Sequence, residues 1–144
     1  MNMSLFNINT PVDLINSALA NSMIGNLRIK IETIANGEVQ ASMPVCTRTA
    51  RPDGILHGGS SLALAETIAG LGSMLLVDLE EFDVLGIQVN ASHTGSLKEG
   101  RVWATAKIIH QGNQTHIWNV DIRNENGRLI SSARVTNMIV KKND

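Results

Sequence analysis

The sequence is poor in the residues that build covalent cross-links and metal clusters. Its 144 residues include one cysteine, Cys46, so no disulfide can form within the chain and no thiolate cluster can bind a metal. None of the histidines falls into a close-spaced metal motif such as H-E-x-x-H; they are His57, His93, His110 and His116. We therefore expect neither a disulfide nor a bound metal.

Neither sign of charge predominates in the sequence. The 12 basic and 13 acidic residues leave a net charge of −1 and form no basic run. Because nucleic-acid-binding proteins carry a positive patch, no nucleic-acid partner is expected. The first residues lack the basic region and apolar core of a signal peptide, so we expect a cytoplasmic location.

Long hydrophobic runs are missing as well. The most apolar stretch, residues 62–77, falls short of the roughly 20 apolar residues that span a membrane. Glu66 lies within it and would cost about 2.5–3.5 kcal/mol in lipid if it behaves like Asp. Hydrophobic residues make up 43% of the chain, which is typical of globular proteins. We predict one domain over residues 1–144, a buried helix at 62–77 and no membrane partner.

Hydrophobic spacing in the first third of the chain predicts a helix and a hairpin. The helix is expected from a Thr10 cap to about Ala20. Two strands follow near residues 27–32 and 38–45. The dipeptide Asn36-Gly37 between them is a strong signal for a two-residue hairpin loop.

The rest of the chain reads as one long helix and four strands. Helical spacing runs from Gly59 to Leu76, where nearly every position is apolar, so the fold should wrap this helix on all sides. Each following strand shows an alternating face: Leu85, Ile87, Val89 and Ala91; Val102, Ala104, Ala106 and Ile108; Trp118, Val120 and Ile122; Leu129, Ser131, Ala133, Val135 and Ile139. His93 and His110 should continue the first two faces, and both Trp103 and Trp118 should pack at an edge or an interface. These elements predict an α+β fold with an antiparallel sheet curled around one helix.

Three motifs follow one another in the last two-thirds of the chain. They are Pro52-Asp53-Gly54-Ile55-Leu56-His57-Gly58-Gly59 with Ala65-Glu66, then Val89-Asn90-Ala91-Ser92-His93 with Glu99-Gly100-Arg101-Val102, and finally Asn126-Gly127-Arg128-Leu129. In this order they resemble the hotdog-fold acyl-CoA thioesterases, in the subgroup of phenylacetyl-CoA, hydroxybenzoyl-CoA and 1,4-dihydroxy-2-naphthoyl-CoA thioesterases. The resemblance implies edge-to-edge homodimers with active sites at the interface, often paired as tetramers. It also implies a CoA thioester as substrate and no cofactor.

Glu66 matches the catalytic carboxylate of the resembled family. It lies about two turns into the long helix, so its side chain should reach a substrate that passes the helix start. Two roles stay open, attack on the thioester carbonyl and activation of water; for an aryl substrate we favour the general base. Without a function, Glu66 would be a structural residue paired with an arginine or a backbone donor.

The turn before this helix supplies the other catalytic candidates. Backbone N–H groups at a helix start lack intrahelical partners and carry the positive end of the helix dipole. The N–H of Gly58 could therefore polarise the thioester carbonyl. Gly59 would leave room for the acyl group, and His57 would either donate to the carbonyl or only hold the loop. A plain structural turn would use the same glycines for backbone freedom.

Two residues depart from the family pattern. Arg51 stands where relatives usually carry a glutamine that positions the thioester. Its guanidinium could contact the carbonyl, the acyl group or Glu66. Gly70 stands where some relatives place a serine or threonine one turn after the carboxylate. These departures concern substrate identity and rate more than reaction class.

The remaining candidates are substrate contacts implied by the resemblance. One set lies on or after a strand and comprises Gly86, His93, Thr94, Gly95 and Ser96. The other is a turn that would meet the nucleotide part of CoA and comprises His110, Gln111, Gly112, Asn113, Gln114 and Thr115. Turns with free N–H groups and short polar side chains can receive phosphate. If these residues do not bind substrate, they are ordinary strand ends and a hairpin turn.

The sequence thus predicts a homo-oligomeric acyl-CoA thioesterase that releases a carboxylate and free CoA, acting on an aryl or otherwise bulky acyl group. Two alternatives stay open. A hotdog hydratase or dehydratase would use His57 and Glu66 for proton transfer beside the carbonyl, and would change enoyl absorbance instead of releasing thiol. A non-catalytic acyl-CoA-binding protein would bind CoA esters without hydrolysing any.

Overall fold

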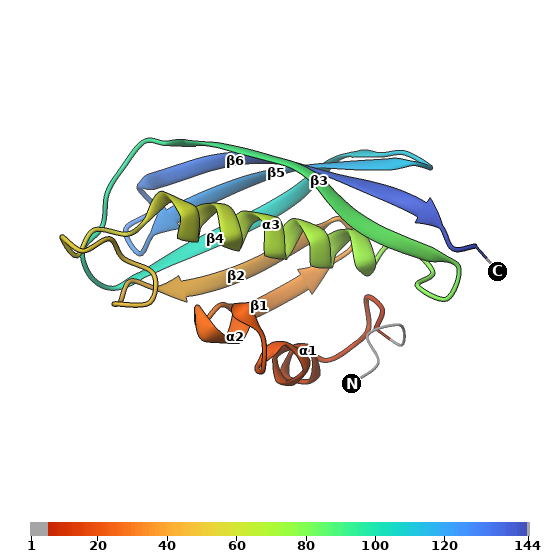
Figure 1. Ribbon diagram of the computed structural model, residues 1–144, viewed down its shortest axis with the longest axis horizontal. Coiled ribbons are helices and arrows are strands. Elements are labelled where there is room, and N and C mark those ends of the chain that lie inside the picture. Colours follow the sequence, from red (N-terminus) through yellow and green to blue (C-terminus); the bar gives the residue numbers. More distant parts are fainter. Residues whose placement is uncertain (1–5, 144) are drawn as a thin grey trace.

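The computed structural model describes residues 6–143, with the helices and strands shown in Figure 1. The helices are α1 (Val12–Leu19), α2 (Met23–Asn26) and α3 (Gly58–Met74). The strands are β1 (Lys30–Ala35), β2 (Glu38–Pro44), β3 (Phe82–His93), β4 (Arg101–Gln111), β5 (Thr115–Asn124) and β6 (Leu129–Lys141). None of the helices in this range is long and apolar enough to cross a membrane.

The strands form a six-stranded antiparallel sheet in the order β1-β2-β4-β5-β6-β3. The sheet curves around α3, while α1 and α2 lie beside β1 (Figure 1). β1 and β3 are therefore the two edges of the sheet. The predicted fold, an antiparallel sheet around one long helix, is confirmed.

The hairpin between β1 and β2 forms at the predicted dipeptide. Ala35 pairs with Glu38, which leaves Asn36 and Gly37 as a two-residue loop. Gly37 has φ of +76°, a backbone conformation that a residue with a side chain rarely adopts.

The segment before β1 differs from the prediction at two points. Ser22 caps the short helix α2, which ends at Asn26 with Leu27 as its C-cap, so the strand begins only at Lys30. Thr10 does not cap α1, because its hydroxyl instead accepts a hydrogen bond from the backbone N–H of Asn7.

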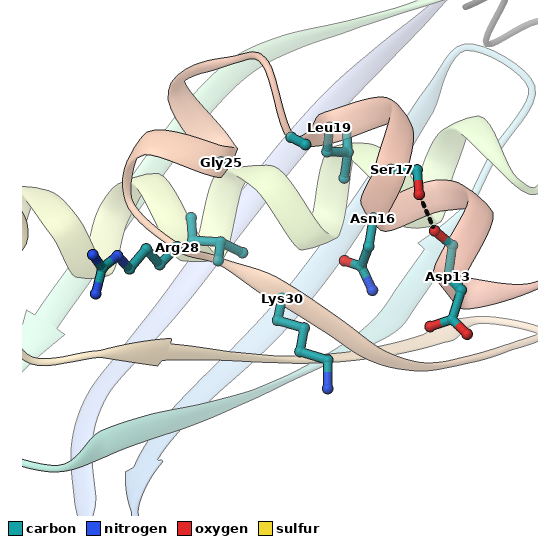
Figure 2. A pocket seen from close by; sticks show the side chains of 9 residues that line it. Asp13, Asn16, Ser17, Leu19, Gly25, Arg28 and Lys30 are labelled. Carbon is teal, nitrogen blue, oxygen red and sulfur yellow. Dashed lines mark hydrogen bonds between the residues drawn. The ribbon is translucent and has the colours of Figure 1, made fainter.

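The outer edge of β1 is covered by α1. The Asn16 side chain donates to the Ile31 carbonyl and accepts from the Ile31 N–H, both at 2.9 Å. Figure 2 shows Asn16 pointing from α1 toward the strand, beside a hollow that Asp13 and Lys30 also line. These bonds satisfy backbone groups that an edge strand leaves open. At the other edge, no described strand or helix pairs with the outer side of β3.

The core lies between the sheet and one face of α3. On the helix, Leu64, Ile68 and Leu71 are buried. The sheet contributes residues that alternate along the strands as predicted; they include Val102, Ala104, Ala106, Val120, Ile122 and Val135.

Trp118 belongs to this core, and the prediction that it packs at an edge or interface is wrong. Its indole is fully buried, and the Nε1–H donates to Ser73 Oγ at 2.8 Å. A Cβ added at Gly72 would lie 2.4 Å from the indole Cη2 atom, so the bare backbone at Gly72 lets the ring pack directly on α3. Trp103, by contrast, is 43% exposed on β4.

The described residues leave the opposite face of α3 uncovered, so the expectation of a helix wrapped on all sides is wrong. This open face comprises Gly59, Ala63, Glu66, Gly70 and Met74, which recur at helical spacing and are exposed or half-buried. Most of them are small, so they look apolar in sequence without supplying side chains that need burial. A Cβ added at Gly70 would meet no atom within 4 Å.

A bulge in β3 changes which of its residues face α3. The register with β6 shifts at Ile87, so Gly86 pairs with Asn137 and turns toward the helix. Leu85 turns outward and is 50% exposed. The predicted continuous face through Leu85 and Ile87 is therefore wrong, because one inserted residue reverses an alternation of period two.

A second bulge, at Ile109 in β4, has the same effect. Ile108 pairs with the buried Trp118, whereas His110 pairs with Ile117 on the other face. The prediction that His110 continues the face of Ile108 is wrong for the same physical reason.

Candidate active site

The start of α3 presents one uncommitted backbone donor. His57 caps the helix: its Nδ1 accepts from the Gly59 N–H at 2.8 Å, and its carbonyl accepts from Ser60 and Ser61. Within residues 6–143, the Gly58 N–H donates no hydrogen bond. Because Nδ1 is the acceptor, the neutral ring of His57 carries its hydrogen on Nε2, which is free to donate. Both donors lie at the positive end of the helix dipole.

His93 packs over this helix start. A Cβ added at Gly58 would lie 2.6 Å from His93 Nε2, so only a glycine admits the imidazole here. The other ring nitrogen, Nδ1, lies 3.0 Å from the hydroxyl of Ser131, a fully buried residue of β6. The structure thus brings together four of the predicted site residues: His57, Gly58, Gly59 and His93.

The segment after β3 lies at the same end of α3. It contains Thr94, Gly95 and Ser96, of which Thr94 and Ser96 are exposed. The carbonyl of the next residue, Leu97, accepts a hydrogen bond from the Leu56 N–H at 2.8 Å. This bond ties the segment to the turn that precedes the helix.

Glu66 lies on the open face of α3, against the edge strand β3. A Cβ added at Gly86 would lie 2.8 Å from Glu66 Oε1, so the missing side chain makes room for the carboxylate. Glu66 is exposed and forms no ion pair within the described part of the chain. The structural alternative, a carboxylate neutralised by an arginine, is therefore absent from these residues.

Arg51 does not contact Glu66. It pairs with Asp53 in the turn before α3, and the guanidinium lowers the pKa of the Asp53 carboxyl by hydrogen bonding to it. The turn is closed by a 2.9 Å bond from the Gly54 N–H to the Arg51 carbonyl. Arg51 is half exposed, so its side chain faces solvent within one protomer.

The second set of predicted contacts, residues 110–115, lies at the opposite end of α3. Part of this turn lines a pocket together with residues 76–78, which follow the helix, and Phe82, which begins β3. His116 is buried beside the turn, and its Nδ1 has no hydrogen-bond partner in the structure. Burial, with a smaller contribution from His110, lowers the pKa of His116 below its ordinary value of 6.5.

The predicted site residues are therefore spread over three places along the helix. His57, Gly58 and residues 93–96 lie at its start, whereas Glu66 with Gly86 lies further along and residues 110–115 lie at its end. Glu66 follows Gly58 by eight residues, which is about 12 Å along a helix. The structure does not bring the carboxylate to the start of its own helix, so one carbonyl group cannot touch both within one chain.

Sequence reasoning assigned no role to Asn137 or to the side chain of Ser131. Ser131 contacts His93, and Asn137 lies beside Gly86 with 1% of its surface exposed. Each is a polar residue at a core-facing position of an alternating strand. A polar residue at such a position indicates a specific hydrogen-bond partner in the fold, since buried polar groups are rarely left without one.

Comparisons with known proteins identify the family and the fold. The sequence profile of the thioesterase superfamily matches residues 53–131. The chain is 38% identical over 129 residues to the 1,4-dihydroxy-2-naphthoyl-CoA hydrolase of Escherichia coli, covering 90% of this chain and 94% of that enzyme. A crystal structure of a mutant thioesterase from Pseudomonas aeruginosa has a TM-score of 0.90 at 36% identity, with 93% of this chain and 96% of the other covered. A thioesterase structure from Haemophilus influenzae has a TM-score of 0.89 at 35% identity over 95% of both chains. The chain therefore belongs to the thioesterase superfamily and has its hotdog fold.

Proposed function

We propose that this protein is a cytoplasmic homodimeric enzyme that hydrolyses an acyl-CoA thioester to a carboxylate and free CoA. The separation of the predicted site residues along α3 carries the proposal. One end of the helix offers donors for a carbonyl oxygen, and the carboxylate lies about 12 Å away. Two chains in opposite orientation supply both halves to one substrate.

The edge strand β3 is the surface on which two chains would meet. It is 12 residues long, its outer side is unpaired within the described residues, and Leu85 and Ile87 on it are 50% and 54% exposed. An open hydrophobic edge is a template for pairing with another strand. Antiparallel pairing about a two-fold axis between Gly86 and His93 would set Glu66 of one protomer beside Gly58 of its partner.

The chemistry follows from the groups that such a pairing assembles. The Gly58 N–H and the His57 Nε2–H donate to the thioester oxygen and stabilise the charge that it gains in the transition state. Glu66 acts as the general base that removes a proton from water. No step needs a metal, and no group of residues in the described range could hold one.

An aryl or otherwise bulky acyl group is the proposed substrate. The support is the similarity to the 1,4-dihydroxy-2-naphthoyl-CoA hydrolase of Escherichia coli, whose name states an aryl substrate. The turn at residues 110–115 would bind the nucleotide part of a CoA whose thioester lies at the shared site. Its backbone N–H groups would donate to the phosphates.

The direct experiment is a free-thiol release assay with aryl, short-chain and long-chain CoA esters. Wild-type protein should favour aryl esters. Glu66→Gln should lower kcat by at least about a hundredfold, as expected for the loss of a general base. Glu80→Gln, a change at an exposed glutamate after α3, serves as the matched control and should keep wild-type activity.

Three outcomes would contradict the proposal. Full activity of Glu66→Gln would remove Glu66 from the mechanism. Loss of enoyl absorbance without thiol release would identify a hydratase. Tight binding of CoA esters without any turnover would identify a binding protein.

Subunit complementation tests the shared site. Glu66→Gln and His57→Ala should each be weakly active alone. Mixed dimers would regain activity, because one of their two sites combines an intact His57 with an intact Glu66 of the partner subunit. If mixing restores nothing although the chains exchange, each site lies within one protomer.

A further inference from the structure

Three residues from three elements converge beside the open face of α3. Glu66 Oε1 and Asn137 Oδ1 both lie within 4 Å of the point where a Cβ of Gly86 would stand, at 2.8 and 3.7 Å. Glu66 comes from α3, Gly86 from β3 and Asn137 from β6. The missing side chain at Gly86 therefore lets a carboxylate oxygen and an amide oxygen approach the same point of the strand.

The orientation of the Asn137 amide follows from its partners. Its Nδ2 donates to the Ala69 carbonyl at 3.1 Å and to Ser73 Oγ at 2.9 Å. A carbonyl can only accept, so the nitrogen must face Ala69. The indole N–H of Trp118 also donates to Ser73 Oγ. The amide nitrogen is thus fixed on the core side, and the oxygen must face Gly86 and the carboxylate.

Both oxygens are hydrogen-bond acceptors, so one donor placed between them can bind both. A water molecule that donates to both needs acceptors roughly 4.5–5.5 Å apart, and two oxygens within 4 Å of one point are compatible with that spacing. We propose that Asn137 is a further catalytic residue, whose side-chain oxygen holds the hydrolytic water against Glu66. The proposal rests on the proposed hydrolase function.

The step balances without any further reactant. One O–H of the water donates to Asn137 Oδ1 and fixes the orientation of the oxygen lone pair. The water oxygen forms a bond to the thioester carbon while Glu66 takes the proton of the other O–H. The C–S bond then breaks, and Glu66 returns the proton to the leaving sulfur, which gives a carboxylic acid and a thiol.

The empty position at Gly70 offers a way to restore the contact. Gly70 follows Glu66 by four residues, so both lie on one face of α3, and a Cβ there meets no atom within 4 Å. A serine at Gly70 would place a hydroxyl beside the same carboxylate, where it can accept from the water in place of Asn137.

The kinetic test compares wild type, Asn137→Val and the double variant Asn137→Val/Gly70→Ser in the thiol-release assay. Asn137→Val should lower kcat at least about tenfold with an unchanged KM, as expected for an interaction made in the transition state. The double variant should regain most of this loss, and Gly70→Ser alone should keep kcat within about threefold of wild type. A merely structural role for Asn137 predicts no such recovery.

Ser73→Ala is the matched structural control. It removes a partner of both Asn137 and Trp118, so it should lower Tm, but the Ala69 carbonyl still holds the amide in place. Its kcat should therefore stay near wild type. An unchanged kcat in Asn137→Val, or an equal loss of kcat in Ser73→Ala, would overturn the proposal.

A crystal structure of the unliganded wild-type protein separates this proposal from the proposed function. We expect a water within hydrogen-bonding distance of both Glu66 and Asn137, and this result does not depend on folding of any variant. Direct contact between the two side chains, or no water at this point, would overturn the role of Asn137. If the water is present but no thioester is hydrolysed, the hydrolase function fails and the water site stands.

Discussion

Gly70 and Gly72 lie two residues apart in α3 and have opposite surroundings. A Cβ at Gly72 would collide with three atoms of the Trp118 ring, the nearest at 2.4 Å, whereas a Cβ at Gly70 would meet nothing within 4 Å. Each glycine costs a helix interior about 1 kcal/mol relative to alanine. At Gly72 this cost is offset by close packing in the core, and at Gly70 no packing compensates for it. One face of α3 is therefore tightly packed in the core, and the other face is open.

A buried polar network lies on the boundary between these two faces. Ser73 accepts from Trp118 on the core side and from Asn137 on the site side. Because donors and acceptors must match, the core fixes the direction in which the Asn137 oxygen points. The bond to the Ala69 carbonyl is the one that fixes this direction, and Ser73 links the same amide to the packed indole of Trp118.

The largest effect is expected at Gly72. Gly72→Ala would overpack a fully buried ring, which typically costs about 1–3 kcal/mol, and the short contacts place this case near the upper end. The loss exceeds the gain of about 1 kcal/mol in helix propensity. Urea unfolding at constant m-value measures the net change. A stabilised Gly72→Ala variant would show that the indole can move and that this face is less tightly packed than the structure indicates.

Gly86→Ala should come next and should act on rate instead of stability. The added Cβ would meet the carboxylate end of Glu66, which is flexible, so the side chain moves at little cost in unfolding free energy. The displaced base should lower kcat about tenfold, equivalent to about 1.4 kcal/mol. Steady-state kinetics and a melting curve on one sample separate the two effects, and a large fall in Tm with unchanged kcat would contradict this assignment.

Gly70→Ala should have a smaller effect of opposite sign. With open space at this position, the variant should gain up to about 1 kcal/mol of stability from helix propensity. The same urea titration used for Gly72→Ala measures it. A loss of stability would reveal that a second chain fills the space beside Gly70.

The smallest effect concerns pH. Burial lowers the pKa of His116, so between its lowered value and the ordinary 6.5 the unfolded chain binds more protons than the folded one. Stability should therefore be full above that range and fall as the solution becomes more acidic. His116→Phe, which removes the unpaired Nδ1, should lose less unfolding free energy between about pH 7.5 and about pH 5.5 than wild type does. Equal losses would show that other groups dominate the acid sensitivity.

Much of the fold could be predicted because local patterns determine it. Alternation placed Val102, Ala104 and Ala106 in the core, and the Asn36-Gly37 dipeptide located the first hairpin. The bulges at Ile87 and Ile109 could not be predicted in this way. Each inserts one residue without a compositional signal, and everything beyond it changes face.

The candidate site residues come from motifs in the sequence, and their arrangement in space comes from the structure. The motifs marked His57, Gly58 and Glu66, and the sequence already placed Glu66 about two turns into the helix. Only the structure shows that His93 lies over Gly58 and that Gly86 lies beside Glu66. Asn137 was missed because its partners, Ala69 and Ser73, lie more than sixty residues earlier in the chain. Pattern reasoning along a sequence does not detect contacts of that range.

The Asn16 side chain that closes the outer edge of β1 has a consequence for assembly. If only one edge of the sheet can pair with another strand, an identical chain can extend the sheet only once. Two chains joined through their open edges leave a blocked edge at each end of the combined sheet. If chains join through β3, α1 therefore limits a continuous sheet to two copies and hinders its growth into a fibre.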